Sequence, residues 1–304
     1  MGTLVRVTVY VEHESAAREG FAAAFERIRQ IDAILSDYRE DSELNAVARS
    51  AVGRPVPVSP DLFQVLQASQ ELAAATGGAF DITQGPVVRL WREARRSGRP
   101  PDPAALRDAA SRSGYRKLHL DPERRTIRID AAGMQLDVGA IGKGYAAGEA
   151  LATLAALGIE HALVAVSGDL AFGKAPPGRH GWRIRLHAGE LSPDGVPESL
   201  ELTGAAVSTS GSSAQHLEVD GRRYSHIVDP ASSTGLVDDL QVTVVARTGL
   251  EADGLSTAVS VLGIDRGLAL VEGRPGAAAL IVRRTGAGAV PFMSSAFREL
   301  AGAR

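Results

Sequence analysis

The sequence predicts an α+β fold in which mixed and antiparallel sheets pack against helices. Strand-like and helix-like segments follow one another without the regular βαβ alternation of a doubly wound parallel sheet. The chain has 304 residues, of which 44% are hydrophobic, so it can bury a substantial core. The sequence contains no internal repeat and no clear linker. We therefore expect residues 1–304 to form a single domain, or two intimate subdomains.

Helices are predicted where apolar residues recur at helical spacing, or where a capping residue precedes a proline. Ser15–Asp37 shows the spacing, and Ser59 followed by Pro60 starts a helix that continues to about Ala75. The full set is Ser15–Asp37, Ser59–Ala75, Pro86 to the residue before Gly98, Asp102 to near Gly114, Gly144–Leu157 and Ala252–Leu262.

Strands are predicted where short segments alternate between apolar and polar residues, or are continuously apolar. The set is Leu4–Glu12, Lys117–Leu120, Thr126–Ile129, Met134–Val138, Ala162–Val166, Trp182–Leu186, Ala206–Ser208, Tyr224–Val228, Gln241–Ala246 and Ala277–Val282. Arg92–Arg99 is rich in arginine and precedes Pro100 and Pro101, which predicts a solvated surface loop.

Composition restricts the class of function. The net charge of -3 does not point to a nucleic-acid partner. The absence of cysteine excludes disulfides, thiolate metal sites and a cysteine nucleophile. No stretch reaches ~18 apolar residues, so no transmembrane segment is predicted. The first ten residues lack the basic and apolar regions of a signal peptide. We expect a cytoplasmic location for the chain as given, or a periplasmic or cell-surface one if a leader was removed.

Two short motifs are the most informative about chemistry. His226 and Asp229 put an imidazole near a carboxylate, beside the turn residue Pro230, while Asp253 and Thr257 stand four residues apart on one face of a predicted helix. An imidazole is a base of near-neutral pKa, and a carboxylate with a hydroxyl suits Mg²⁺ better than zinc. The motifs indicate Mg²⁺-assisted phosphate chemistry, but a structural histidine and a helix cap are open alternatives.

Two glycine-containing segments resemble ligand-binding loops. Leu136–Ala146 passes from a strand through glycines into a helix, an arrangement that binds phosphate at a helix N-terminus. It lacks the Ser or Thr that follows the lysine of a Walker A loop, since Gly144 follows Lys143. Gly78–Pro86 is a loop containing an aromatic residue and Asp81, which can cap its own turn. Either segment can equally be a packing turn.

Taken in order, these motifs resemble those of the ApbE-type FAD:protein FMN transferases, nearly from end to end. The segments that carry the resemblance are Met1-Gly2-Thr3, Ser36-Asp37-Tyr38, Asp41-Ser42-Glu43-Leu44-Asn45, Gly78-Ala79-Phe80-Asp81-Ile82-Thr83, Gly139-Ala140-Ile141 with Lys143-Gly144-Tyr145-Ala146, Ser167-Gly168-Asp169, Thr209-Ser210-Gly211, Ser225–Pro230 and Ala252–Thr257.

The resemblance implies an α+β fold with a deep FAD groove. It implies transfer of the FMN moiety of FAD to a threonine or serine hydroxyl of an acceptor flavoprotein, with release of AMP, so that FAD is a substrate and Mg²⁺ a cofactor. His226 would be the catalytic base. Asp253, Thr257 and the main-chain carbonyl of Ala140 would bind the metal. The implied FAD contacts are Met1, Tyr38, Ala79, Phe80, Asp81, Lys143 and Ile227.

The chain departs from the family pattern in two places. Ser167-Gly168 stands where family members commonly have two glycines, and Ala231–Gly235 is longer than the usual Arg-Thr-Gly turn. Three alternative functions stay open. They are an Mg²⁺-dependent FAD pyrophosphatase that yields FMN and AMP, a non-catalytic FAD-binding protein, and a Ser–His–Asp hydrolase with Ser210 or Ser212 as nucleophile. The hydrolase is disfavoured because the sequence has no G-x-S-x-G motif.

Overall fold

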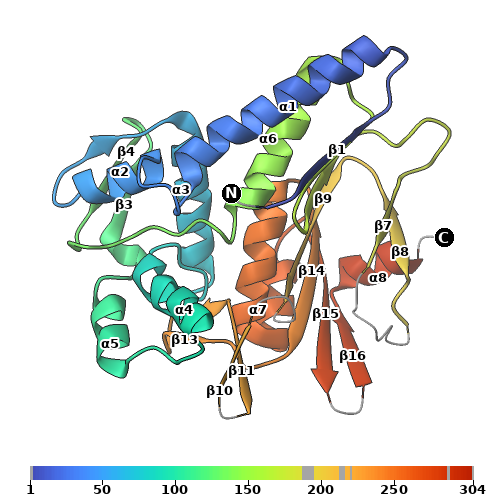
Figure 1. Ribbon diagram of the computed structural model, residues 1–304. Helices are drawn as coiled ribbons and strands as arrows, with labels where there is room; N and C mark the ends of the chain where they lie inside the picture. The colour runs from blue at the N-terminus through green and yellow to red at the C-terminus, as the bar shows by residue number, and fades with distance from the viewer. Residues whose placement is uncertain (1–2, 187–194, 212–215, 220, 286–287, 303–304) are drawn as a thin grey trace. The chain divides into compact units, whose positions relative to one another are not determined.

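The computed structural model describes residues 3–186, 195–211, 216–219, 221–285 and 288–302 (Figure 1). The chain divides into two compact units, each assembled from segments far apart in the sequence. Unit 1 comprises Met1–Ile31, Ile141–Ser210 and Asp239–Arg304, and unit 2 comprises Asp32–Ala140 and Gly211–Asp238. The strands pair antiparallel and helices pack against them, so the predicted α+β class is confirmed.

Unit 1 is built on a seven-stranded sheet in the order β1-β5-β6-β9-β14-β15-β16. Antiparallel pairing joins β1 to β5, β5 to β6, β6 to β9, β14 to β15 and β15 to β16. The strands are β1 Val5–Val9, β5 Ala162–Val166, β6 Asp169–Phe172, β9 Ala205–Gly211, β14 Leu240–Ala246, β15 Ala278–Thr285 and β16 Gly288–Met293.

Helices cover one face of this sheet, while a helix and a hairpin cover the other (Figure 1). Successive strand residues point to opposite faces. Val164 and Val166 therefore pack with residues of α1 and α6, whereas Leu280 and Val282 pack with Phe297 of α8 and with the hairpin. The elements are α1 Glu14–Leu35, α6 Gly142–Ala156 and α7 Gly249–Glu272 on the first face, and α8 Ser295–Gly302, β7 Trp182–Arg185 and β8 Ser199–Leu202 on the second.

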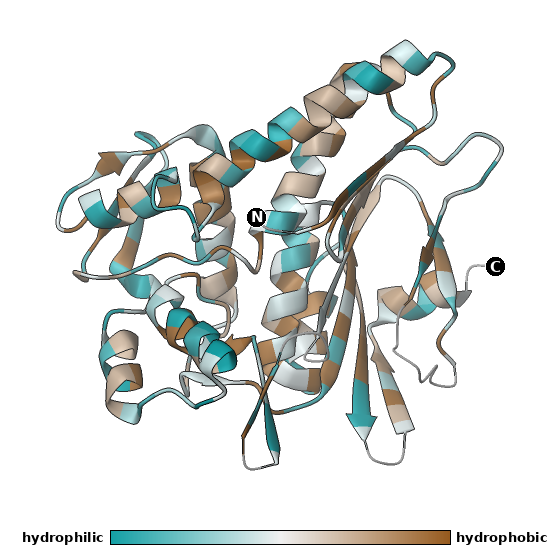
Figure 2. Cartoon of the chain, viewed as in Figure 1, coloured by the Kyte–Doolittle hydropathy of each residue, from teal (hydrophilic) through white to brown (hydrophobic). Residues whose placement is uncertain are grey.

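Unit 2 combines helices with short antiparallel ribbons. Helix α4 buries Val87, Trp91 and Ala94 and carries arginines on its other face, so Figure 2 shows hydrophobic and hydrophilic residues interleaved along it. The elements are α2 Glu43–Ser50, α3 Pro60–Ala75, α4 Gly85–Ser97, α5 Pro103–Ser111, the 3₁₀ turn Tyr115–Lys117, and the strands β2 Val56–Pro57, β3 Leu118–Asp121, β4 Thr126–Ile129, β10 His216–Val219, β11 Arg222–Ser225, β12 Val228–Asp229 and β13 Thr234–Gly235.

Three sequence predictions are wrong in this unit. Met134–Val138 is not a strand, because its backbone pairs with the loop before α4, through an isolated bridge between Gln84 and Gln135 and a bond from Asp137 N to Ile82 O of 2.7 Å. The predicted strand Tyr224–Val228 breaks into β11 and β12, with a bend at residues 226 and 227. Arg92–Arg99 is not a loop, since its first six residues complete α4.

Helix α7 is longer than predicted and meets the length and composition expected of a membrane span. It extends from Gly249 to Glu272 across a kink at Gly263, where φ is 75° and ψ is -172°. Half of its most apolar window is buried inside the protein, and the helix carries the buried carboxylate of Asp253. A core helix can have the same length and apolar composition. These two properties alone are therefore weak evidence that α7 spans a membrane.

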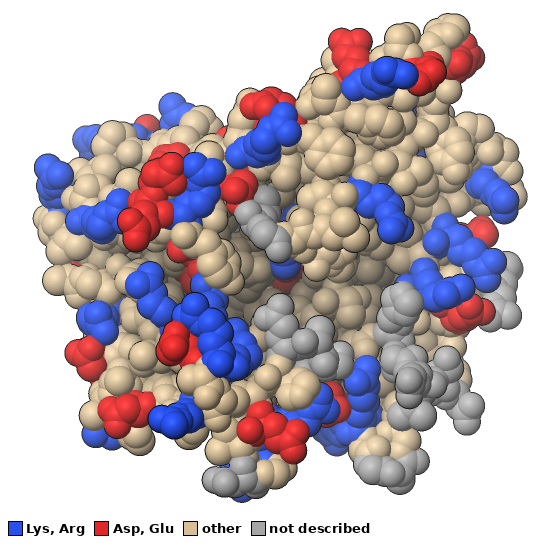
Figure 3. Space-filling model, in the orientation of Figure 1, with Lys and Arg blue, Asp and Glu red and all other residues tan. Residues whose placement is uncertain are grey.

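Basic and acidic side chains lie interspersed on the face of the molecule shown in Figure 3. Some charged side chains pair within a single helix. In α1, Arg18 pairs with Glu14, and in α4, Arg96 pairs with Glu93. Such exposed pairs keep the surface solvated and contribute little to stability.

Candidate functional site

In unit 1 a buried charge cluster lies where the N-terminus of α6 meets the first turns of α7. Lys143 Nζ lies 2.9 Å from Asp169 Oδ2 and 3.4 Å from Asp253 Oδ1. Gly144 N donates to Asp253 Oδ2 at 2.9 Å. Both carboxylates are buried, so one ammonium and one helix-terminal N–H compensate two acids away from water.

The close approach of α6 to α7 requires glycine on both helices. A Cβ on Gly144 would lie 2.0 Å from Gly249 O, and a Cβ on Gly249 would lie 2.1 Å from Gly144 O. Both distances are shorter than any van der Waals contact. The glycine that follows Lys143 therefore lets the two helices touch, and this contact brings Gly144 N to the Asp253 carboxylate.

Burial, and after it the neighbouring Asp169 carboxylate, raise the pKa of the Asp253 carboxyl to about 6, against the opposing effects of Lys143 and the Gly144 N–H. For Lys143, burial alone would lower the pKa of the ammonium, but Asp253 and Asp169 together raise it above its ordinary value. Lys143 therefore stays charged at neutral pH. When both acids are ionised the cluster carries a net negative charge, which favours a further cation or a proton.

A row of hydroxyls connects this cluster to the predicted metal ligand on the next turn of α7. Ser208 Oγ donates to Asp169 Oδ1 at 2.5 Å and lies 3.1 Å from Ser256 Oγ. Ser210 Oγ lies 2.8 Å from Ser256 Oγ and 3.5 Å from Thr257 Oγ1. Sequence reasoning missed Asp169, Ser208 and Ser256 as members of the site. The motifs containing Asp169 and Ser210 were visible, but nothing in them indicated that they meet.

The oxygen donors of α7 fit Mg²⁺. Asp253 and Thr257 stand one turn apart, as predicted. Ala140, whose carbonyl is the third predicted ligand, is the last residue of unit 2 and immediately precedes Ile141 at the start of α6. Among the residues that the structure describes, no three His, Asp or Glu side chains form a metal-binding group. A cation here would take the Asp253 carboxylate with the Thr257 hydroxyl, oxygen donors that Mg²⁺ accepts together with water and phosphate.

In unit 2 the ring of Tyr38 is presented to solvent, with 74% of the residue exposed. The guanidinium carbon of Arg92 lies 4.5 Å from its centroid. Arg92 also pairs with Asp37, and its Nη2 lies 2.7 Å from Asp137 Oδ2. Asn45 Nδ2 donates to Asp37 O at 3.1 Å. The motif that ends at Asn45 therefore fixes the turn that carries Tyr38.

The predicted FAD-contacting run Ala79–Asp81 forms a tightly bonded turn. Asp81 Oδ1 accepts bonds from Thr83 N at 2.8 Å and Thr83 Oγ1 at 2.6 Å, and its Oδ2 accepts one from Tyr115 N at 3.0 Å. The ring of Phe80 is buried and its N donates to Thr76 Oγ1 at 3.1 Å. Asp81 thus has the capping role that the sequence allowed. Contact of this run with FAD stays a prediction.

His226, the predicted base, lies at the bend between β11 and β12 rather than inside a strand. Two hydrogen bonds hold the backbone of the bend, one to a side-chain hydroxyl and one between main-chain groups. Ile227 N donates to Ser225 Oγ at 3.1 Å, and Leu236 N donates to Ile227 O at 2.9 Å. Ile227, a predicted FAD contact, has a buried side chain. These bonds fix the backbone beside His226.

The turn after His226 is held by its own carboxylate and by α4. Asp229 accepts bonds from Ala231 N at 3.0 Å and Ser232 Oγ at 2.8 Å, so it caps this turn. Trp91 Nε1 donates to Ser233 O at 2.9 Å. The longer segment that departs from the family pattern therefore supplies the carbonyl that ties it to α4.

Met1, a predicted FAD contact, and Ser212, an alternative nucleophile, lie outside the described residues.

Ser167 has φ of 58°, in the left-handed region that favours glycine. Glycine would adopt this conformation without strain, at the turn that leads into Asp169.

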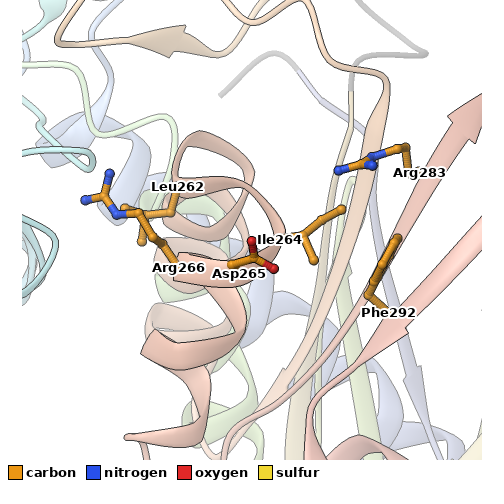
Figure 4. A pocket seen from close by; sticks show the side chains of 6 residues that line it. All are labelled: Leu262, Ile264, Asp265, Arg266, Arg283 and Phe292. Carbon is orange, nitrogen blue, oxygen red and sulfur yellow. The ribbon is translucent and has the colours of Figure 1, made fainter.

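A separate pocket of about 410 Å³ lies in unit 1 beside the kink of α7. Figure 4 shows residues of α7 on one side of it and residues of β15 and β16 on the other. It is lined by Leu262, Ile264, Asp265, Arg266, Arg283 and Phe292. None of these residues is a predicted site residue.

Comparison with known proteins extends the sequence resemblance. Residues 1–281 match the ApbE family. A FAD:protein FMN transferase of Klebsiella pneumoniae is 32% identical over 98% of this chain and 86% of its own length. One of Treponema pallidum is 33% identical over 93% and 82%.

Solved structures agree in fold. The apo form of the Pseudomonas stutzeri flavinyl transferase ApbE has a TM-score of 0.84 and 33% identity, and the match covers 99% of this chain and 98% of that one. The Vibrio cholerae flavin transferase ApbE has a TM-score of 0.85 and 27% identity, with coverage of 99% and 96%. The resemblance predicted from the sequence motifs is confirmed: this chain belongs to the ApbE family.

Proposed function

We propose that this protein transfers the FMN moiety of FAD to a threonine or serine hydroxyl of an acceptor flavoprotein and releases AMP. The observation that carries the proposal is the buried cluster of Lys143, Asp169 and Asp253 at the contact of α6 with α7. It occurs in a chain whose relatives are FAD:protein FMN transferases. The cluster combines a permanent cation with oxygen donors, which is the chemistry that a pyrophosphate substrate requires.

Each residue then has a defined role. Asp253, Thr257 and the carbonyl of Ala140 would hold Mg²⁺, which supplies positive charge to the phosphate oxygens of FAD when it is bound. The ammonium of Lys143 pairs with the same pyrophosphate, because its raised pKa keeps it protonated. The Tyr38 ring and the run Ala79–Asp81 contact FAD, as do Met1 and Ile227.

His226 acts as the general base. Its imidazole takes the proton from the acceptor hydroxyl as the hydroxyl oxygen attacks the FMN phosphorus. A new P–O bond forms to the acceptor and the P–O bond to AMP breaks, so AMP departs with the electron pair of that bond. His226 lies at the bend between β11 and β12, where Ile227 N donates to Ser225 Oγ.

The proposal is tested with FAD, Mg²⁺ and a candidate acceptor domain, by intact mass of the acceptor and in-gel flavin fluorescence. We expect an acceptor that gains one FMN. His226→Ala should lower the transfer rate by about 10²–10⁴-fold while FAD still binds. The exposed His216 in β10 provides the matched control, His216→Ala, which should transfer at the normal rate.

Two results would contradict the proposal. Free FMN and AMP with an unmodified acceptor would make the protein a pyrophosphatase. Normal transfer by His226→Ala would remove the imidazole from the role of base.

A further inference from the structure

We infer that Arg92 is a positioning residue of the transferase, which holds the exposed ring of Tyr38 and the turn that carries Ala140 at a fixed distance from each other. The identity of the ligands, FAD and Mg²⁺, rests on the proposed function. The geometry lies wholly within unit 2. No motif of the sequence marked Arg92, which was expected to be solvated.

One planar guanidinium joins three segments of the chain. It projects from α4, pairs through Nη1 with Asp37 in the turn after α1, and pairs through Nη2 with Asp137 Oδ2 at 2.7 Å in the segment before α6. The same group stacks on the Tyr38 ring at 4.5 Å. A fork of fixed donors with a flat face is suited to this combination, and an ammonium is not.

Asp137 links Arg92 to the predicted metal-binding turn. Its Oδ1 accepts a bond from Gly139 N at 2.9 Å, while its Oδ2 is the partner of Arg92. Its own N donates to Ile82 O at 2.7 Å. The carboxylate therefore closes the turn that leads to Ala140 with one oxygen and anchors it to α4 with the other. Arg92 acts on the Ala140 carbonyl through this carboxylate.

The Arg92 guanidinium compensates the charges of two largely buried carboxylates. The side chains of Asp37 and Asp137 are only 14% and 11% exposed. Burial raises the pKa of Asp37, the nearby Asp137 carboxylate raises it further, and Arg92 opposes both. Both carboxylates pair with the one guanidinium, so loss of its charge would leave two largely buried acids uncompensated. By contrast, Arg96, one turn further along α4, pairs with the exposed Glu93.

The test measures FAD affinity by calorimetry and the Mg²⁺ concentration at half-maximal transfer rate. The variant is Arg92→Lys, which keeps the charge and the fold but cannot stack and bridge at once. We expect FAD Kd to rise about 3–10-fold, from the loss of the stacked guanidinium. The half-saturating Mg²⁺ concentration should also rise, while the rate at saturating FAD and Mg²⁺ falls by less than about twofold. Arg96→Lys is the matched control and should change neither affinity.

Two double-mutant cycles separate positioning from a general loss of stability. In the Tyr38→Ala background, Arg92→Lys should change FAD Kd by less than about twofold, because the two residues act as a unit. In the Asp137→Asn background, it should no longer change the Mg²⁺ requirement. Additive effects in both cycles would overturn the inference, and so would an equal effect of Arg96→Lys.

Failure here can be told from failure of the proposed function. If the unsubstituted protein binds FAD but never modifies an acceptor, the proposed function is wrong. Coupling of Arg92 to Tyr38 in FAD affinity would then still support this inference. If transfer occurs and the cycles are additive, only this inference is wrong. An unsubstituted protein that does not bind FAD would overturn both.

Discussion

The decisive residue of unit 1 is Asp253, because it is both buried and shared between partners. Its carboxylate contacts the Lys143 ammonium and accepts the N–H of Gly144, and it belongs to the same helical face as Thr257. Asp169 competes for the same lysine. A divalent cation bound at Asp253 would relieve the repulsion between the two acids, so metal and proton compete for one site.

This competition predicts a pH-dependent metal affinity. Burial and then Asp169 raise the pKa of Asp253 to about 6 in the metal-free protein, so the carboxyl is protonated below that pH and ionised above it. We expect the half-saturating Mg²⁺ concentration to fall about tenfold per pH unit as pH rises toward that value, and to level off above it. Asp253→Asn should weaken Mg²⁺ binding and remove the dependence. A Mg²⁺ titration of the unsubstituted protein with the same midpoint at all pH values would contradict the assignment.

The sequence indicated candidate site residues but not the partners that the structure gives them. Asp253 and Thr257 were predictable because helical spacing alone puts them on one face. Arg92 was not, because its partners Asp37 and Asp137 lie 55 and 45 residues away and no local pattern announces such a contact. A run of arginines is usually solvated. Here a tertiary contact overrides that expectation.

Helix α4 is the element that organises unit 2. Two consecutive residues of α4 hold two different segments of the chain. Trp91 Nε1 donates to Ser233 O in the turn after His226. Arg92 stacks on Tyr38 and pairs with Asp137. Residues one apart on a helix point about 100° away from each other, so one helix can hold two different segments. The amphipathic sequence of α4 thus holds the turn after His226 as well as the turn that carries Tyr38.

The contact between α6 and α7 is the most sensitive element of unit 1. Gly144→Ala would place a Cβ 2.0 Å from Gly249 O, a backbone atom that cannot yield as a side chain can. We expect the free energy of unfolding to drop by about 1–3 kcal/mol and the Mg²⁺ requirement to rise, because the helices must separate at Asp253. Urea denaturation and Mg²⁺ titration measure these two quantities.

The same helix offers a matched control. Gly148 lies on α6 with no atom within 4 Å of an added Cβ. Gly148→Ala should raise the free energy of unfolding by about 0.5–1 kcal/mol, because alanine favours a helix over glycine. If both substitutions shifted stability alike, the helix contact would not have the role assigned to it.

At the scale of the whole molecule, local signals predicted helices better than sheets. Caps followed by proline, at Ser59 and at Asp102, start α3 and α5 as expected. Met134–Val138 shows strand-like alternation, but its neighbour is a loop, so no strand forms. Whether an extended segment becomes a strand depends on a partner elsewhere in the chain, which a single sequence does not reveal.

The exact division into two units also could not be predicted from local sequence patterns. Each unit takes its segments from both halves of the sequence, so no linker separates them. The predicted site residues are distributed over both units, with Lys143, Asp253 and Thr257 in unit 1 and Tyr38, Ala140 and His226 in unit 2. Only the order of the family motifs connected these residues before the fold was known.

An acceptor hydroxyl that splits FAD in place of water leaves a simple stoichiometry. The ratio of AMP released to FMN covalently attached can be measured by chromatography and intact mass in one reaction. We expect a ratio of about one, with AMP release that requires both Mg²⁺ and the acceptor. AMP released at the same rate without any acceptor, together with free FMN, would contradict it.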